Sequence, residues 1–112
     1  MRFKAVVSVA ESWGQVAGEL CEGAAGITPD LAALWVSPHF GPDYGPLVSA
    51  IRDTLNPRNL IGCTTAGVIG SGREIESSPG AVLWVAELPD VRVLPFILDQ
   101  QDLATLKSAE DW

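Results

Sequence analysis

The stretch Leu60–Glu76, "LIGCTTAGVIGSGREIE", marks a change of pattern in the chain. An apolar run that contains Gly62 reaches Cys63, two threonines follow, and small residues with three further glycines lead to Arg73-Glu74. Glycines let a chain turn tightly and approach neighbouring backbone closely. We therefore expect a strand, Arg58–Thr64, that ends in a glycine-rich turn.

Upstream of this stretch, strand and helix patterns alternate. The Val-rich run Phe3–Ala10 is typical of a strand, and the continuous apolar run Leu31–Ser37 is typical of a strand buried on both faces. Ser12 and Gln15 have the spacing of a capping box. They open a helix whose apolar stripe consists of Trp13, Val16, Ala17, Leu20, Cys21 and Ala24.

A second helix is expected from Pro46, which suits a first helical turn, to the stop signal Asn56-Pro57. Its apolar stripe consists of Tyr44, Leu47, Val48, Ile51 and Leu55. Strands that alternate with helices favour right-handed βαβ crossovers and a parallel sheet.

Downstream, Gly80–Leu88 and Val91–Leu98 are apolar runs joined only by Pro89-Asp90, which predicts an antiparallel pair. Pro95 confines the second run to a sheet edge or a bulge, and a short helix is expected from Asp102. The predicted fold is α/β, a β-α-β-α-β parallel core followed by an antiparallel β-hairpin, with the mixed sheet sandwiched by helices. We expect residues 1–112 to form a single domain, and the unfinished sheet predicts a partial or truncated version or pairing with another copy.

Composition narrows the classes of function. The chain has 112 residues, 47% of them hydrophobic, and a net charge of −7. An acidic chain whose basic residues are scattered is a poor partner for nucleic acid or an anionic membrane. No apolar run approaches the roughly 18 residues of a membrane span, and no signal peptide is recognisable, so a bacterial-type cytoplasmic protein is expected.

Few residues are suited to metal or cofactor chemistry. Cys21 lies on the core face of its helix, and Cys63 ends a strand far from it in sequence, so two reduced thiols are expected. The single histidine, His39, has no zinc-site spacing to either cysteine. We expect no metal and no cofactor.

Three kinds of chemistry are conceivable around Cys63. A phosphate-binding loop is disfavoured because a Ser-Ser-Pro-Gly run replaces the helix that should follow it. A thiol nucleophile would need His39 as its activator, oriented by Asp43 or Asp30. A carboxylate could be held by Arg73 together with the threonine hydroxyls, although Arg73 could equally pair with a surface acid.

The segment "LIGCTTAGVIGSGREIESSPGAVLWVAELPDVRVLPF" resembles the FIST N domain, the amino-terminal part of the FIST sensory module. The resemblance rests on Ile-Gly-Cys at a strand end, on Ala-Gly-Val-Ile-Gly, on Arg-Glu and on Pro95-Phe96, and "DLAALWVSPHF" also fits. It implies a non-catalytic signal-input domain that binds a small ligand, an amino acid being one candidate. The family module continues beyond this chain, so the resemblance also implies a truncated version, a partial domain or a stand-alone short version.

The expected ligand site is the loop region after the second and third strands. Its residues are Gly62, Cys63, Thr64, Thr65, Gly67 and Arg73, with His39 at the rim. The alternatives are a thiol-dependent hydrolase or transferase that uses Cys63 with His39, and a self-associating interaction module. The expected partners are a small-molecule ligand and either a second copy or a signalling protein.

Overall fold

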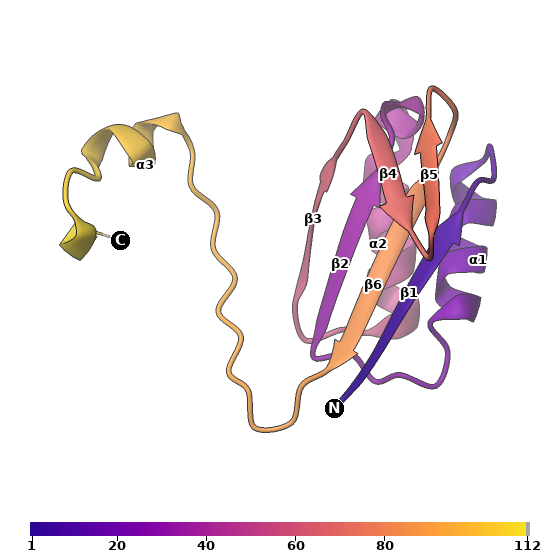
Figure 1. The fold of residues 1–112 in the computed structure, drawn as a ribbon, viewed down its shortest axis with the longest axis horizontal. Helices are drawn as coiled ribbons and strands as arrows, with labels where there is room; N and C mark the ends of the chain where they lie inside the picture. The colour runs from indigo at the N-terminus through magenta and orange to yellow at the C-terminus, as the bar shows by residue number, and fades with distance from the viewer. Residues whose placement is uncertain (112) are drawn as a thin grey trace.

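The computed structural model describes residues 1–111, whose helices and strands are labelled in Figure 1. A four-stranded sheet has the order β1-β6-β2-β3, and a separate two-stranded sheet consists of β4 and β5. In chain order the elements are β1 (Arg2–Ser8), α1 (Trp13–Gly23), β2 (Leu31–Val36), η1 (Pro38–Asp43), α2 (Tyr44–Leu55), β3 (Leu60–Thr64), β4 (Gly67–Gly70), β5 (Arg73–Glu76), β6 (Ala81–Glu87), α3 (Gln100–Thr105) and η2 (Ala109–Asp111).

The expected helix boundaries follow local chemistry closely. The Ser12 side chain accepts a hydrogen bond from the Gln15 N–H at 3.3 Å, which confirms the Ser12 half of the predicted capping box. Asn56 ends α2 in the left-handed conformation with φ 47°. The short helix α3 begins at Gln100 rather than Asp102, because Asp99 and Asp102 form a reciprocal capping box.

The predicted parallel core is only partly correct. β2 and β3 are parallel neighbours joined by α2, as expected for a βαβ unit. β1 does not pair with β2, because β6 lies between them and is antiparallel to both. The structure is therefore mixed α/β, with one parallel pair of neighbours among the described strands.

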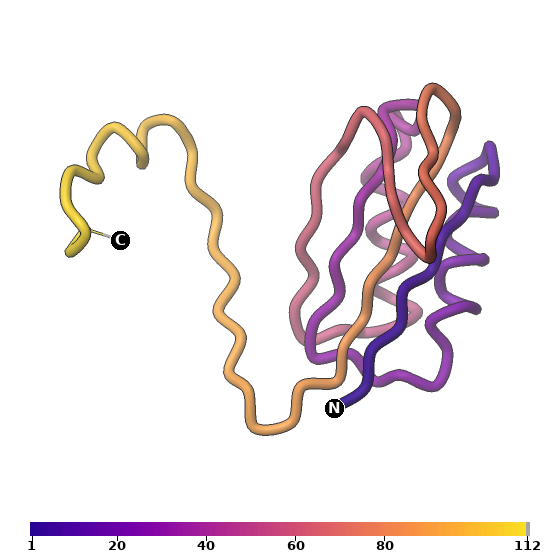
Figure 2. The backbone as a smooth tube through the Cα atoms, in the orientation of Figure 1, coloured from indigo at the N-terminus to yellow at the C-terminus, as the bar shows by residue number. Residues whose placement is uncertain are grey.

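The predicted strand Val91–Leu98 is wrong, since residues 91–98 have no strand assignment and run away from the body (Figure 2). Both edges of β6 are already occupied, by β1 and by β2, so β6 has no backbone groups left for a hairpin partner. The Val91 N–H donates instead to the Leu88 carbonyl at 3.3 Å, in a turn where Asp90 has φ 62°. We call residues 91–98 the tail segment.

The glycine-rich turn is a real hairpin, β4–β5. Ser71 and Gly72, with φ values of 50° and 75°, form its two-residue loop, and two successive positive φ values are typical of a type I′ turn. Gly70 lets the hairpin lie on the sheet, because an added Cβ would come within 2.9 Å of Val7 and Val82.

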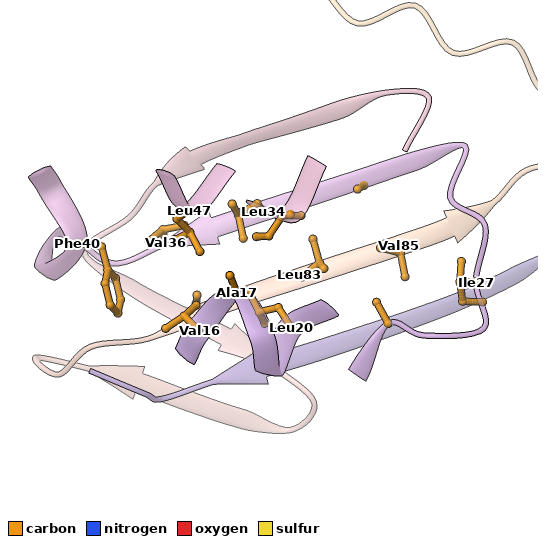
Figure 3. Close-up of a cluster of buried hydrophobic side chains, with 14 residues drawn as sticks. Val16, Ala17, Leu20, Ile27, Leu34, Val36, Phe40, Leu47, Leu83 and Val85 are labelled. Carbon is orange, nitrogen blue, oxygen red and sulfur yellow. The ribbon is translucent and has the colours of Figure 1, made fainter. Parts of the chain in front are cut away.

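Helices do not sandwich the sheet as predicted. Both α1 and α2 cover one face, where Val16, Leu20, Leu34, Leu47 and Leu83 belong to the main core (Figure 3). The opposite face carries the β4–β5 hairpin, whose inward side chains meet the sheet in a second cluster of Val68, Ile75 and Val82, with Val7 and Trp35 packed against it. A two-stranded hairpin therefore replaces the expected second helical layer.

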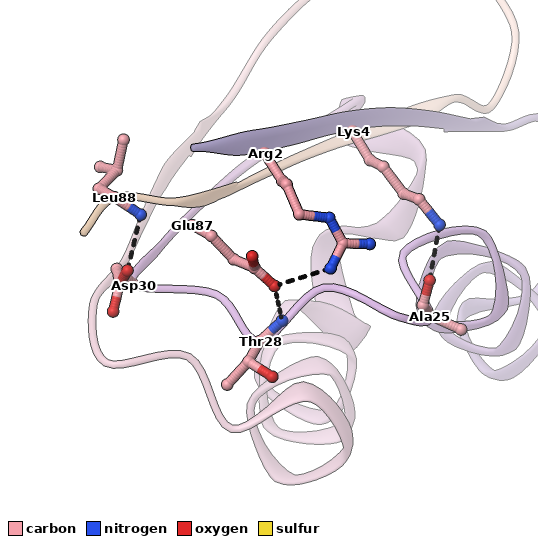
Figure 4. A network of polar contacts seen from close by, with 7 residues as sticks. All are labelled: Arg2, Lys4, Ala25, Thr28, Asp30, Glu87 and Leu88. Carbon is pink, nitrogen blue, oxygen red and sulfur yellow. Dashed lines mark hydrogen bonds and ion pairs between the residues drawn. The ribbon is translucent and has the colours of Figure 1, made fainter.

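Polar contacts tie together the end of the sheet at which β6 terminates (Figure 4). Glu87 accepts the Thr28 N–H at 2.9 Å and pairs with Arg2 at 3.5 Å. Asp30 accepts the Leu88 N–H at 2.7 Å. These bonds fix where the chain leaves β6 and enters β2.

Candidate functional site

A groove of about 500 Å³ lies between α2 and the edge strand β3. It exists because β3 has a neighbour on one side only, and no further helix among the described elements continues the layer beyond α2. Its apolar lining includes Leu34 and Val36 of β2, Val48 of α2 and Leu60 of β3. The groove is therefore a continuation of the hydrophobic core that opens at the sheet edge.

Polar and charged groups line the same groove. Arg52 comes from the last turn of α2, and Arg58 lies just before β3, so the βαβ connection brings both to one end of the groove. Tyr44 and Thr64 also line it, and the Tyr44 hydroxyl donates to the Ser37 carbonyl at 3.4 Å. Apolar walls with a few convergent polar groups are typical of small-molecule sites.

Both arginines are available to a ligand. The Arg58 Nε lies 3.5 Å from the Asp30 carboxylate, and its side chain is 83% exposed. Exposed ion pairs of this kind are worth about 0–1 kcal/mol, so a bound anion could compete with Asp30. Within residues 1–111, the Arg52 side chain donates only to the Ser49 hydroxyl at 3.4 Å, an exposed contact.

The structure distributes the predicted site residues over several places. Gly62, Cys63 and Thr64 line the groove. Thr65 and Gly67 line a second, smaller hollow of about 280 Å³ beside Trp35, where the Thr65 hydroxyl oxygen is buried without a hydrogen-bond partner among the described atoms.

Arg73 and His39 line neither hollow. Arg73 begins β5 and is exposed. The exposed His39 lies in η1, with its Nδ1 3.0 Å from the Ser37 hydroxyl.

Strand packing by itself explains why position 62 is a glycine. A Cβ at this position would clash with the carbonyl oxygen of Leu34, in the neighbouring strand β2. Glycine therefore allows β3 to pair closely with β2, whether or not a ligand lies in the groove.

The two thiols differ in environment. Cys63 is exposed at the groove, and Cys21 is half-buried against the main core. Burial raises the pKa of the Cys21 thiol, and a hydrogen bond with Thr54 opposes this in part. Over residues 1–111, no hydrogen bond joins Cys63 to His39, the contact through which a histidine activates a thiol.

Arg52 and Arg58 line the groove, although the sequence, in which the basic residues are scattered, does not single them out. Their places in the sequence could have indicated that they lie together, because the last turn of a helix and the start of the following strand meet at one end of a βαβ unit. Within the described part of the chain, no group of three or more His, Cys, Asp or Glu side chains could hold a metal ion. Among the described helices, none has the length and apolarity that crossing a membrane requires.

Comparison with known families is decisive for the class of domain. The family model described as FIST N domain matches residues 30–108, from the start of β2 through α3. The chain belongs to the FIST N domain family. FIST domains are regarded as sensory domains of signal transduction, and the matched residues include the groove, the β4–β5 hairpin and the tail segment.

Relatives of this FIST N chain occur in mycobacteria. It is 32% identical over 93 residues to "Uncharacterized protein MT0656" of Mycobacterium tuberculosis (strain CDC 1551 / Oshkosh), a match that covers 80% of this chain and 24% of the relative. It is 31% identical over 72 residues to "Uncharacterized protein Mb0898c" of Mycobacterium bovis, covering 64% and 19%. The chain thus spans about a quarter of the length of the first of these relatives. No solved structure matches it significantly.

Proposed function

We propose that this FIST N chain is a non-catalytic sensory domain that binds a small organic acid, such as an amino acid, in the groove between α2 and β3. The observation that carries the proposal is that Arg52 and Arg58 both line one end of a mainly apolar groove. Arginine holds a carboxylate by two parallel hydrogen bonds. An apolar side chain of the ligand would then lie along Val48 and Leu60.

The remaining polar groups of the groove would orient the ligand. Thr64 and Cys63 lie on β3 beside Tyr44, away from the arginine end. A ligand with a second polar group, such as an amino-acid ammonium, could reach the Thr64 hydroxyl or a β3 carbonyl while its carboxylate stays at the arginines. In this arrangement Thr65, Gly67, Arg73 and His39 have no direct contact with the ligand.

The proposal is tested by thermal shift and calorimetry against the twenty amino acids, small dicarboxylic acids and nucleotides. A ligand at a hundredfold excess over its dissociation constant stabilises the folded state by about 2.7 kcal/mol. We expect Arg52→Ala and Arg58→Ala each to weaken binding about tenfold or more, because each removes a charge-assisted hydrogen bond of about 1.5–3 kcal/mol.

Arg73→Ala is the matched control, since Arg73 is exposed on the hairpin and outside the groove. Unchanged binding in this variant supports the groove. Binding that is lost in Arg73→Ala and kept in the other two variants would move the site to the loop after Cys63 and refute the groove assignment.

The exposure of Cys63 at the groove favours one second candidate, a thiol-dependent hydrolase or transferase. This candidate requires that Cys63 react with iodoacetamide much faster than a free cysteine at neutral pH. It also requires His39→Ala to remove that excess reactivity. We further propose a cytoplasmic location, supported by two unpaired cysteines.

A further inference from the structure

The tail segment exposes an unusual run of apolar side chains. Phe96 is 79% exposed and Ile97 is 93% exposed, and Val91, Leu94 and Leu98 are exposed as well. In an extended chain, Leu94, Phe96 and Leu98 point to one side, and Val91, Val93 and Ile97 point to the other. A segment that is apolar on both sides is typical of a strand covered on both faces.

β3 offers an edge that suits such a strand. Its outer backbone edge is unpaired among the described strands. The apolar groove with Val48 and Leu60 flanks it on the helix side, and Ile61 is 46% exposed beside it. The other edge strand, β1, is less suitable, because the Ser71 hydroxyl already donates to its Ala5 carbonyl.

Charges distinguish the two possible directions of pairing. β6 is antiparallel to β2 and ends where β2 and β3 begin, so the tail segment of the same chain would start at the beginning of β3 and run parallel to it. Parallel pairing brings Arg92 toward Arg58, which is a like-charge contact. It also carries Asp99 away from the arginine end of the groove.

Antiparallel pairing reverses both contacts. Arg92 then lies toward the end of β3 and the start of α2, where Asp43 is located, and Asp99 lies toward Arg52 and Arg58. A second copy of the chain can approach in this direction. Because both copies have the same tail and the same edge, the contact is reciprocal about a twofold axis.

We propose that the tail segment of one chain adds as an antiparallel strand to the β3 edge of a second copy, and that the exchange is reciprocal. Strand addition satisfies backbone groups at an open edge, and side chains on alternate positions fill the flanking pockets. The assembly does not depend on a ligand, so the failure of the ligand proposal would leave it intact.

The test combines solution mass with cysteine cross-linking in the full chain. In a Cys21→Ala background, Cys63 near the end of β3 is the single thiol. Oxidation of Val93→Cys or Leu94→Cys is expected to give a covalent dimer, because antiparallel pairing places the early tail opposite Cys63. Ile97→Cys and Leu98→Cys are expected to cross-link at least tenfold less.

Light scattering with size-exclusion chromatography should give twice the chain mass without any oxidant. The double variant Leu94→Asp/Phe96→Asp is expected to run as a monomer with unchanged circular dichroism, since neither residue belongs to a core cluster. Ile69→Asp, at a 75% exposed position on β4, is the matched control and should remain dimeric.

Three results would overturn the proposal. If the chain is a monomer at all concentrations, the tail segment of a second copy does not pair with the β3 edge. A covalent monomer from the cysteine pairs assigns the β3 edge to the tail of the same chain, and preferential cross-linking at positions 97 and 98 reverses the direction. A dimer that persists in Leu94→Asp/Phe96→Asp means that a different surface mediates association.

Discussion

Ser37 holds together two parts of the fold that are far apart in sequence. It follows β2 and is 1% exposed, and its hydroxyl accepts the Gly80 N–H at 3.0 Å. The Ser37 N–H donates in return to the Gly80 carbonyl at 2.9 Å. Gly80, just before β6, is therefore fixed by both a backbone bond and a side-chain bond.

Ser37→Ala removes the hydroxyl and leaves the backbone bond in place. The Gly80 N–H loses its partner in a buried position, where an unsatisfied donor costs about 1–3 kcal/mol. We expect the free energy of unfolding to fall by that amount. For a domain of this size the melting temperature should fall by roughly 4 °C for each kcal/mol.

Urea unfolding followed by tryptophan fluorescence measures this difference, with an unchanged m-value as evidence that the unfolding reaction is the same. Ser49→Ala is the control, because the Ser49 hydroxyl only receives an exposed contact from Arg52, and its removal should change stability by less than about 0.5 kcal/mol. If Ser37→Ala is as stable as Ser49→Ala, the Gly80 N–H is not held as described, and the reasoning fails.

Other substitutions test other parts of the fold. Leu20→Ala should lose about 2–5 kcal/mol of stability in urea, because Leu20 is fully buried between α1 and the sheet, whereas Leu103→Ala on the exposed helix α3 should lose less than about 0.5 kcal/mol. Gly70→Val should lose about 1–3 kcal/mol, since its side chain would collide with the valines beneath the hairpin. The raised pKa of the Cys21 thiol predicts a stability that is constant below the ordinary pKa of a cysteine thiol and then falls as pH rises, because the thiol of the unfolded chain ionises first. Unfolding at a series of pH values should show a smaller fall in Cys21→Ala.

The sequence was informative wherever local chemistry sets the structure. Residues close by in the sequence decide three of these features: the Ser12 cap, the left-handed Asn56 and the buried run of β2. The βαβ unit from β2 to β3 was predictable for a similar reason, because a short crossover through a helix requires parallel strands.

Strand order was not predictable, because it depends on contacts between distant residues. An apolar strand such as β6 fits equally well at an edge or in the centre of a sheet, and only its pairing with both β1 and β2 excludes a hairpin with the tail segment. The β4–β5 hairpin had a local signal, Ser71-Gly72 between Val68 and Ile75, but the surrounding glycines resembled a loop.

The candidate site was predictable in part for the same reason. The strand end at Cys63 could be recognised in the sequence, and the structure places Gly62, Cys63 and Thr64 in one groove. The charge at that groove comes from Arg52 and Arg58, which are defined by how α2 returns to the start of β3. Arg73 follows Cys63 within the glycine-rich stretch, but the hairpin carries it away from the groove.

The open edge of β3 links the two proposals of function and assembly. The groove is open because no strand lies beyond β3 and no helix lies beyond α2 among the described elements. A tail strand from a second copy would form the missing outer wall, with Asp99 close to the arginines that we assign to the ligand carboxylate. Ligand and tail would then compete for Arg52 and Arg58, so an acid that binds the groove should weaken the dimer. Affinity that is unchanged between the dimer and the Leu94→Asp/Phe96→Asp monomer would show that the two sites are independent.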